Sequence, residues 1–524
     1  MPNKPVHPTN EGKRTQGKQK ALPDQFLYAR KGPWPQPSPS HPLLCADEVL
    51  NIPPIETLMF NATIGERYLT ARVAFPPVAA MYAVSVEKWA GPDDVRFNKI
   101  MFDSVYTRFL KPLVENEHKE LIKHVSDCGN YEKLWKYDFT AMDKVEPIDN
   151  TYCAATVLYL GEKSDGSRES ICIKVNQVYI LPKDPAWMIG KIYVLQGAAY
   201  HVLFVVHPSL HFPMDAVNAI TKSSVAIAHP LFQALHPHTA YSLALDNAVL
   251  ESAESVVNNN AQGTRFDPLT GNAYNLKLLF GAGYTGLSDE QYTNGYPAFN
   301  YMKPSMYYSD PAMAEYSFDS DYGRWLADYY NSAFLPFAQK IADHILKDNS
   351  LTDYRTRWAR YNHTHVLGFP SEHEIHDRDV FAAAIAVFMW DTSVSHGGDH
   401  YSFAYDVEVV EKCLRIRIPP PQSSQDSPTI EGNLFTGDDM ARASICQNMF
   451  FEPSVIKPSL AETLYAFTSA ELQLAVKQFH IDLRNVDKTA GCKLMPLIAR
   501  NKEECGENAP CVSYKNTIPQ SIQY

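Results

Sequence analysis

Two histidine doublets, each with the spacing of one helical turn, constrain this chain more than any other feature of its sequence. They follow the apolar runs 198–206 and 380–390, and they are His207/His211 and His396/His400. Residues four apart share one face of a helix, so each doublet can direct two imidazoles at one point. Imidazoles carried into a core by apolar helices need partners, and a transition metal can use all four. The alternative interpretation is four separate core histidines bonded to backbone carbonyls.

The composition of the 524 residues indicates one large globular domain. With 45% apolar and 12% aromatic residues the chain can bury a large core, and its composition shows no break within residues 46–524. Residues 1–45 are polar and rich in proline, which predicts a partly disordered arm. The net charge of −12 argues against nucleic acid or an anionic membrane surface as a partner.

Cysteine usage and the hydropathy of the chain favour a cytoplasmic protein. Nine cysteines, an odd number scattered along the sequence, are not typical of a secreted disulfide framework. The sequence begins without an apolar signal segment. No apolar run reaches the roughly 18 residues that a transmembrane helix needs. We therefore expect reduced thiols and no transmembrane segment.

The periodicity of apolar residues predicts a mainly α fold with a small β-hairpin element. Strand patterns at 153–160 and 171–175 flank the turn signal Ser164-Asp-Gly166, which predicts a hairpin. A tyrosine- and glycine-rich stretch at 281–320 is expected to be an ordered loop. Helical patterns cover the remaining long segments, at 77–125, 185–260, 321–348, 375–395 and 460–500.

An ordered set of motifs from about residue 150 to the end resembles the catalytic domain of lipoxygenases. Besides the doublets and the hairpin, Trp390 lies six residues before His396, as in the second metal helix of that family. The other matching segments are Trp187-Met-Ile-Gly-Lys191, His229-Pro-Leu-Phe-Gln-Ala-Leu-His-Pro-His238, Arg415-Ile-Arg-Ile-Pro-Pro-Pro421 and Ile518-Pro-Gln-Ser-Ile-Gln-Tyr524. The resemblance implies a single lipoxygenase-like helical domain without the N-terminal lipid-binding β-barrel of animal and plant members.

The resemblance also implies a site and a reaction. The expected ligands of a non-haem iron are His207, His211, His396, His400 and the main-chain carboxylate of Tyr524. Manganese stays open, since nitrogen and oxygen ligands bind both metals. The implied activity is hydrogen-atom abstraction at a ferric hydroxide from an unsaturated apolar substrate, for which a polyunsaturated fatty acid is one candidate, followed by insertion of O2.

Several positions depart from the family pattern. Three residues separate His207 from His211 where the family has four. A kinked, locally re-registered helix could still present both imidazoles, but His207 is the least secure of the expected ligands, and His201 is the reserve for the first ligand. Val202 and Phe403 stand where the family has glutamines beside the ligands, and Val249 stands where it has Ala or Gly. These three positions predict a tighter, more apolar substrate pocket.

Two other functions stay open beside dioxygenation. A metalloenzyme of specialised metabolism could cyclise, cleave or rearrange a substrate that is not a fatty acid, and a metal-free pseudoenzyme could bind an apolar ligand. Other metal sites are less favoured. No histidine follows His480-Ile-Asp482 to complete a facial triad, and the pair His373/His376 has the polar setting of a solvated helix face. We expect His236 and His238 to bond backbone groups.

Overall fold

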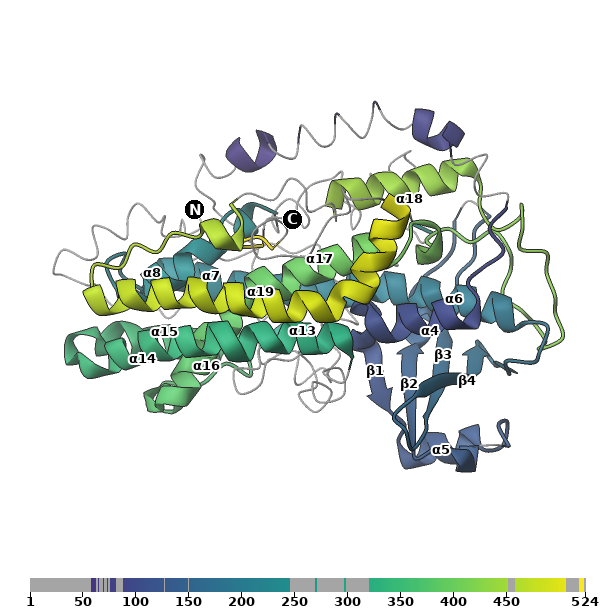
Figure 1. Cartoon of the computed structure of the whole chain (residues 1–524), viewed down its shortest axis with the longest axis horizontal. Helices are drawn as coiled ribbons and strands as arrows, with labels where there is room; N and C mark the ends of the chain where they lie inside the picture. The colour runs from purple at the N-terminus through teal and green to yellow at the C-terminus, as the bar shows by residue number, and fades with distance from the viewer. Residues whose placement is uncertain are drawn as a thin grey trace, which may run out of the picture.

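The computed structural model describes residues 58–62, 76–81, 88–126, 128–148, 150–245, 320–450, 458–505 and 518–522, with a few further positions between these ranges. The predicted arm at 1–45, and all but a few positions of the predicted loop at 281–320, lie outside the described residues. The elements are a small sheet at one end of a body of long helices (Figure 1). The mainly α class predicted from the periodicity is confirmed.

The sheet is antiparallel, with five strands in the order of the chain. Its third and fourth strands form the predicted hairpin, and Gly166 in their connection has a φ of +80°, which a residue without Cβ adopts at little cost. Because β3 is buried along its whole length, the sheet belongs to the core. The strands are β1 (Leu110–Pro112), β2 (Lys133–Phe139), β3 (Thr156–Glu162), β4 (Arg168–Val175) and β5 (Val178–Ile180).

The helical prediction for residues 77–125 is wrong in part. Helix α4 (Asp94–Asp103) leads into a short 3-10 helix η2 (Val105–Phe109), then β1, and only then α5 (Glu115–Leu121). Strand β2, absent from the prediction, alternates buried and less buried residues at Trp135, Tyr137 and Phe139. That period of two marks a strand with one face on the core.

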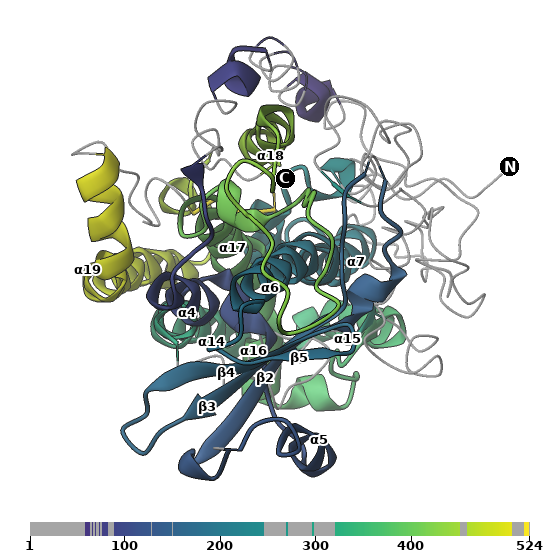
Figure 2. The same cartoon turned by 90° about the vertical axis from the view of Figure 1, so that its right-hand side faces the viewer.

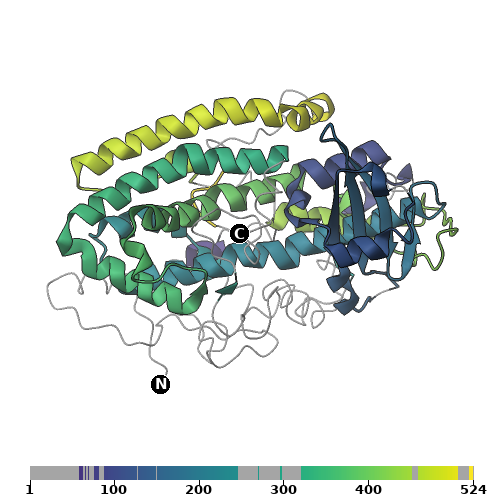
Figure 3. The ribbon, with the colours of Figure 1, turned by 90° about the horizontal axis from the view of Figure 1, so that it is seen from below.

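The helical body surrounds two helices that are buried on all sides. These are α6 and α16, and α6 packs against β3 and β4 at the centre of the view from the sheet end (Figure 2). Helices α13 and α14 follow each other end to end, and α19 runs alongside both (Figures 1 and 3). The helices after α5 are α6 (Trp187–His201), α7 (His207–Ser224), α8 (Pro230–Leu235), α13 (Asp321–Tyr329), α14 (Leu335–Lys347), α15 (Thr352–His365), α16 (Arg378–Trp390), α17 (His396–Tyr405), α18 (Gly437–Phe450) and α19 (Ala470–Cys505).

Minor elements complete the described chain. A two-residue strand β6 (Tyr296–Pro297) pairs in parallel with β7 (Val366–Leu367). Helix α19 begins ten residues later than the start predicted at 460, after the short turn Leu460–Glu462. The other 3-10 turns are Cys128–Asn130, Thr140–Lys144, His236–Thr239, Asn349–Leu351, Glu374–His376 and Val410–Lys412. Within the described ranges, no helix combines the length and hydropathy needed to cross a membrane.

Three π-helical turns interrupt the long helices. They are η5 (Val202–Val206) between α6 and α7, η9 (Tyr330–Phe334) between α13 and α14, and η12 (Asp391–Ser395) between α16 and α17. Proline follows two of them, at Pro208 and Pro336. A proline inside a helix cannot donate to the preceding turn and its ring crowds the carbonyl there, so a wider turn just before it relieves the conflict.

Candidate metal centre

The four histidines of the two doublets converge. The Nε2 atom of His396 lies 2.9 Å from Nε2 of His211 and 3.1 Å from Nε2 of His400, and His400 Nε2 lies 2.9 Å from Nε2 of His207. Each doublet belongs to one helix, α7 or α17, and its two rings lie on one face as the spacing predicts. The structure therefore brings together all four histidines that the sequence selects.

These separations fit a shared metal ion. Two nitrogens bonded to one ion at about 2.1 Å and at right angles lie about 3 Å apart. Hydrogen bonding alone explains the contacts less well. A neutral Nε2 is either one donor or one acceptor, and the three contacts form a chain through His400 and His396. At most two of them can therefore be conventional hydrogen bonds, whereas an ion accepts all four lone pairs.

The surroundings of His207 and His396 favour the neutral imidazole, which is the form that binds metal. His396 and His400 are fully buried, with 2% and 1% of their surfaces exposed. Burial lowers the pKa of His207 well below its ordinary value, and the neighbouring imidazoles of His400 and His211 lower it further. The pKa of His396 falls for the same reasons. Nδ1 of His396 has no hydrogen-bond partner among the described residues.

Both doublets begin directly after a π turn. The backbone N–H of His207 donates to the carbonyl of Val202, and that of His396 donates to the carbonyl of Asp391, each five residues earlier. An i→i−5 bond accommodates one extra residue in the helix. The extra residue is absorbed before His207, and His207 and His211 face the site from one α-helix with regular α spacing.

The reserve ligand His201 lies elsewhere. Its ring packs against Phe139 and Phe109, at centroid distances of 4.8 and 5.7 Å, and its Nδ1 is 2.8 Å from the carbonyl oxygen of Gly197. Burial lowers its pKa to about 4. His201 is a core histidine bonded to a carbonyl, and the structure gives it no place in the cluster.

The segment near the chain end passes beside the second doublet. Ile518 accepts a hydrogen bond from the Leu460 N–H at 2.8 Å, and the Gln520 carbonyl lies 2.6 Å from Nδ1 of His238. A Cβ added at Gly397 would lie 2.6 Å from Cδ of Pro519, so only glycine permits this approach to α17. Residues 518–522 are therefore packed rather than frayed. Tyr524 lies outside the described residues.

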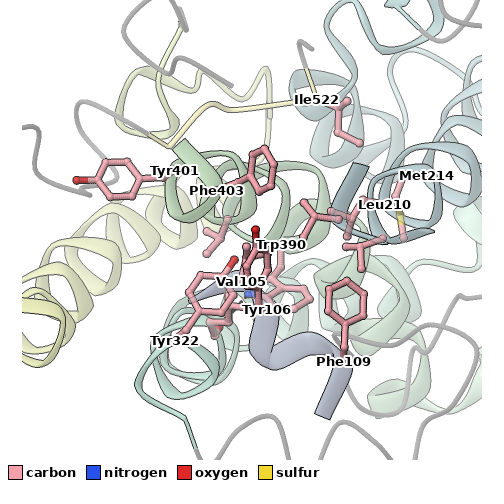
Figure 4. Packing of buried hydrophobic residues seen from close by; sticks show 14 of the residues in the cluster. Val105, Tyr106, Phe109, Leu210, Met214, Tyr322, Trp390, Tyr401, Phe403 and Ile522 are labelled. Carbon is pink, nitrogen blue, oxygen red and sulfur yellow. Dashed lines mark hydrogen bonds between the residues drawn. The ribbon is translucent and has the colours of Figure 1, made fainter. Parts of the chain in front are cut away.

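Two of the three predicted pocket residues are described, and both are buried apolar side chains. Val202 opens the π turn η5, and Phe403 lies on α17 three residues after His400, under the Lys412 ammonium at 4.9 Å. Figure 4 shows Phe403 in one apolar cluster with Leu210 and Ile522. Val249 lies outside the described residues.

The remaining histidine motifs do not form a metal site among the described residues. His373 and His376 are exposed, and Nδ1 of His376 is 2.8 Å from an Arg355 nitrogen. His238 contacts a backbone carbonyl, as expected, and its Nε2 lies 2.8 Å from the Tyr465 hydroxyl. His480 is not in the one metal-capable group, which is His207, His211 and His396.

Two residues beside the site escaped the sequence analysis. Arg108 and Asp399 form an ion pair at 2.7 Å, and both side chains are completely buried. Asp399 stands between two ligand candidates on an apolar helix, and that setting could have marked it. Nothing in the sequence indicates its partner, because the two lie 291 positions apart.

Comparisons with known proteins identify the fold. No family model matches the sequence, and no curated protein matches it. Solved structures do match. A LOX variant in complex with arachidonate has 15% identity and a TM-score of 0.65, over 99% of this chain and 81% of that one. The manganese lipoxygenase of Gaeumannomyces graminis has 13% identity and a TM-score of 0.61, over 90% and 91%.

A calcium-dependent 11R-lipoxygenase has 15% identity and a TM-score of 0.59, over 82% of this chain. The chain spans 66% of that lipoxygenase's length. The three neighbours are lipoxygenases, and the match to each covers most of this sequence. Identities this low carry no statement about activity. The chain has the fold of a lipoxygenase-like catalytic domain.

Proposed function

We propose that the protein is a non-haem metal dioxygenase that inserts O2 into an unsaturated apolar substrate. The observation that carries the proposal is the convergence of four imidazoles, three of them buried and that of His207 half-buried, with successive Nε2 atoms 2.9–3.1 Å apart. Iron is the metal we propose. Manganese is the alternative, supported by the manganese lipoxygenase among the structural neighbours.

The proposed ligand set is His207, His211, His396, His400 and the main-chain carboxylate of Tyr524. Support for the fifth ligand comes from the packed segment that ends two residues before Tyr524. His238 contacts the Gln520 carbonyl of that segment. Gly397 lets Pro519 pack closely against α17, the helix that carries the second doublet. A carboxylate balances part of the charge of the ion, which four neutral imidazoles cannot do.

The chain's own contribution to the reaction is placement and the exclusion of water. A redox-active iron or manganese held here would supply hydrogen-atom abstraction from a weak C–H bond, after which dioxygen combines with the carbon radical. The buried apolar cluster includes Leu210, Phe403 and Ile522, each at most 1% exposed. Such surroundings exclude water and polar side chains, with which a carbon radical could react. No acid or base side chain is needed for these steps.

The proposed substrate class is a lipid-like molecule with an activated C–H bond. The arachidonate complex among the neighbours supports a fatty acid. Val202 and Phe403, both apolar where the family pattern is polar, support a tighter pocket. We therefore expect weak turnover of common polyunsaturated fatty acids and faster oxygen insertion after Val249→Ala.

Metal analysis and oxygen uptake test the proposal. Purified wild type should hold near one iron or manganese per chain and should consume O2 with its substrate. His211→Ala and His396→Ala should lose the metal, while His201→Ala, a matched buried histidine outside the cluster, should keep it. Wild type that binds neither metal would leave a metal-free binding protein as the better function.

The second candidate is oxidative cyclisation, cleavage or rearrangement of a substrate that is not a fatty acid. The apolar residues Val202 and Phe403 beside the ligands favour it, because partners at such positions tune a metal. Product mass separates the two candidates. Addition of two oxygen atoms supports dioxygenation, and products without both oxygens support the second candidate.

The fifth ligand needs its own test. Tyr524→Ile keeps the main-chain carboxylate and should keep metal and activity. A single residue added after Tyr524 moves the charge away and should lower both. If a tag at the chain end leaves metal content and turnover intact, the carboxylate is not a ligand.

A further inference from the structure

A buried ion pair lies directly behind the second doublet. The Arg108 Nε donates to Asp399 Oδ1 at 2.7 Å, and its Nη2 donates to the Ser395 hydroxyl at 2.9 Å. Neither charged side chain has any exposed surface. Arg108 belongs to η2, a short turn between α4 and the sheet, whereas Asp399 and Ser395 belong to the metal helix and its π turn.

The contacts with η2 form a stripe along one face of this helix. Ser395 and Asp399 accept hydrogen bonds from Arg108, and the Ser402 hydroxyl accepts one from the Val105 N–H at 2.8 Å. These three positions have the spacing i, i+4, i+7 of one helix face. Each immediately precedes a residue of the site, namely His396, His400 and Phe403. The stripe therefore lies about 100° around the helix from the ligands.

The pair is restrained from a second side as well. The Tyr322 hydroxyl donates a short hydrogen bond to the same Asp399 oxygen that Arg108 contacts. A Cβ at Gly398 would lie 3.2 Å from that hydroxyl and 2.6 Å from the Trp325 ring, so glycine is required for the close packing of α13 here. Asp399 thus holds α17 to two other elements.

A small rotation of α17 would displace the ligand atoms that this helix carries, and the ion pair restrains that rotation. A rotation of α17 by about 10° would move an atom about 6 Å from its axis by about 1 Å. A hydrogen-bonded ion pair in a dry interior is strongly directional, so it adds a specific restraint on this rotation to the one that the packing supplies. A buried pair is also a poor source of stability when compared with apolar side chains of similar size.

We propose that Arg108 is a positioning residue for the metal centre. Through Asp399 and Ser395 it fixes the rotation of α17, and so the direction in which His396 and His400 meet His207 and His211. The inference rests on the proposed function, because it concerns the geometry of the same ion. Arg108 touches neither substrate nor metal in this scheme.

A second buried pair supplies a matched control. Arg415 and Asp439 lie 3.0 Å apart and are 3% and 1% exposed, but neither belongs to a metal helix. Full-length Arg108→Lys and Asp399→Asn proteins are compared with Arg415→Lys and Asp439→Asn. For each we measure thermal stability, the affinity for Fe²⁺ and Mn²⁺ by chelator competition, and the EPR spectrum of the oxidised ion.

All four substitutions should lower the melting temperature. Those at Arg108 and Asp399 should in addition weaken metal binding by roughly 10- to 100-fold and change the EPR line shape. Those at Arg415 and Asp439 should leave both metal readouts at wild-type values. Wild-type affinity and spectrum in the Arg108 or Asp399 variants, or equal changes in the control pair, would overturn the inference.

The double variant Arg108→Met/Asp399→Leu covers the case in which single variants do not fold. It removes both buried charges and should fold, yet it should still bind metal with an altered spectrum. A wild-type spectrum would reduce the pair to a structural role. Failure of the proposed function is distinguishable, because wild type itself would then bind no metal.

Discussion

Gly397→Ala should separate the metal centre from the chain end while leaving the helix intact. The new Cβ would lie 2.6 Å from Pro519 Cδ and 3.7 Å from the Ile518 Cα. Carbon atoms pack at about 3.5–4.0 Å, so the C-terminal segment must retreat by about 1 Å. Alanine also favours helix over glycine by up to about 1 kcal/mol. The substitution therefore acts on the contact with residues 518–519, and the helix itself gains.

We expect metal affinity to fall by roughly 10- to 100-fold and oxygen uptake by about 100-fold, with helix content unchanged. Chelator competition, an oxygen electrode and circular dichroism measure the three quantities. Gly190→Ala is the matched control, since its Cβ would meet only Ile180 and Ile173, at 3.4–3.5 Å, on another buried helix. Wild-type metal binding and turnover in Gly397→Ala would refute the view that close packing here positions a ligand.

Three more outcomes follow from the site. His201→Asn should keep full metal occupancy, in contrast to His207→Ala, as measured by elemental analysis. Burial lowers the pKa of His201 and of His238 to about 4, so each contributes up to about 3 kcal/mol that is present above pH 6.5 and lost as the pH falls towards 4; urea unfolding at pH 7 and 4.5 should show this loss, and a smaller one in His238→Asn. Removal of the metal with a chelator should lower the melting temperature of wild type more than that of His396→Ala, because only a bound ligand stabilises the fold by mass action.

The parts of the structure that the sequence predicts are those with a local signature. The hairpin of β3 and β4 has its turn residues in place, and the doublets carry the helical spacing that brings each pair of rings onto one face. Strand β2 also has a local signal, the alternation of Trp135, Tyr137 and Phe139 with less buried residues, although it was not predicted.

The parts that could not be predicted depend on contacts between distant segments. The sequence gives no reason for a buried Asp399, because its partner Arg108 is distant in the chain. Gly397 alone predicts a less stable helix, and its role appears only in the fold, where Pro519 packs against it. The sequence preferred His207 to His201 as the first ligand, but it did not show the π turn that lies between them.

The π turns have a consequence for how such a site can change over time. A π turn is a one-residue insertion that the helix has absorbed, and one stands at the entrance to each ligand pair. The turn that joins each pair to its buried helix can therefore gain or lose a residue. The α-helix that follows the turn keeps the spacing between the two histidines of the pair. Gaining or losing one residue at Val202–Val206 or Asp391–Ser395 would leave the core helix in register and re-aim two imidazoles together. The core helix and the spacing within each pair would both be kept, so such a change would alter only the direction in which the pair faces.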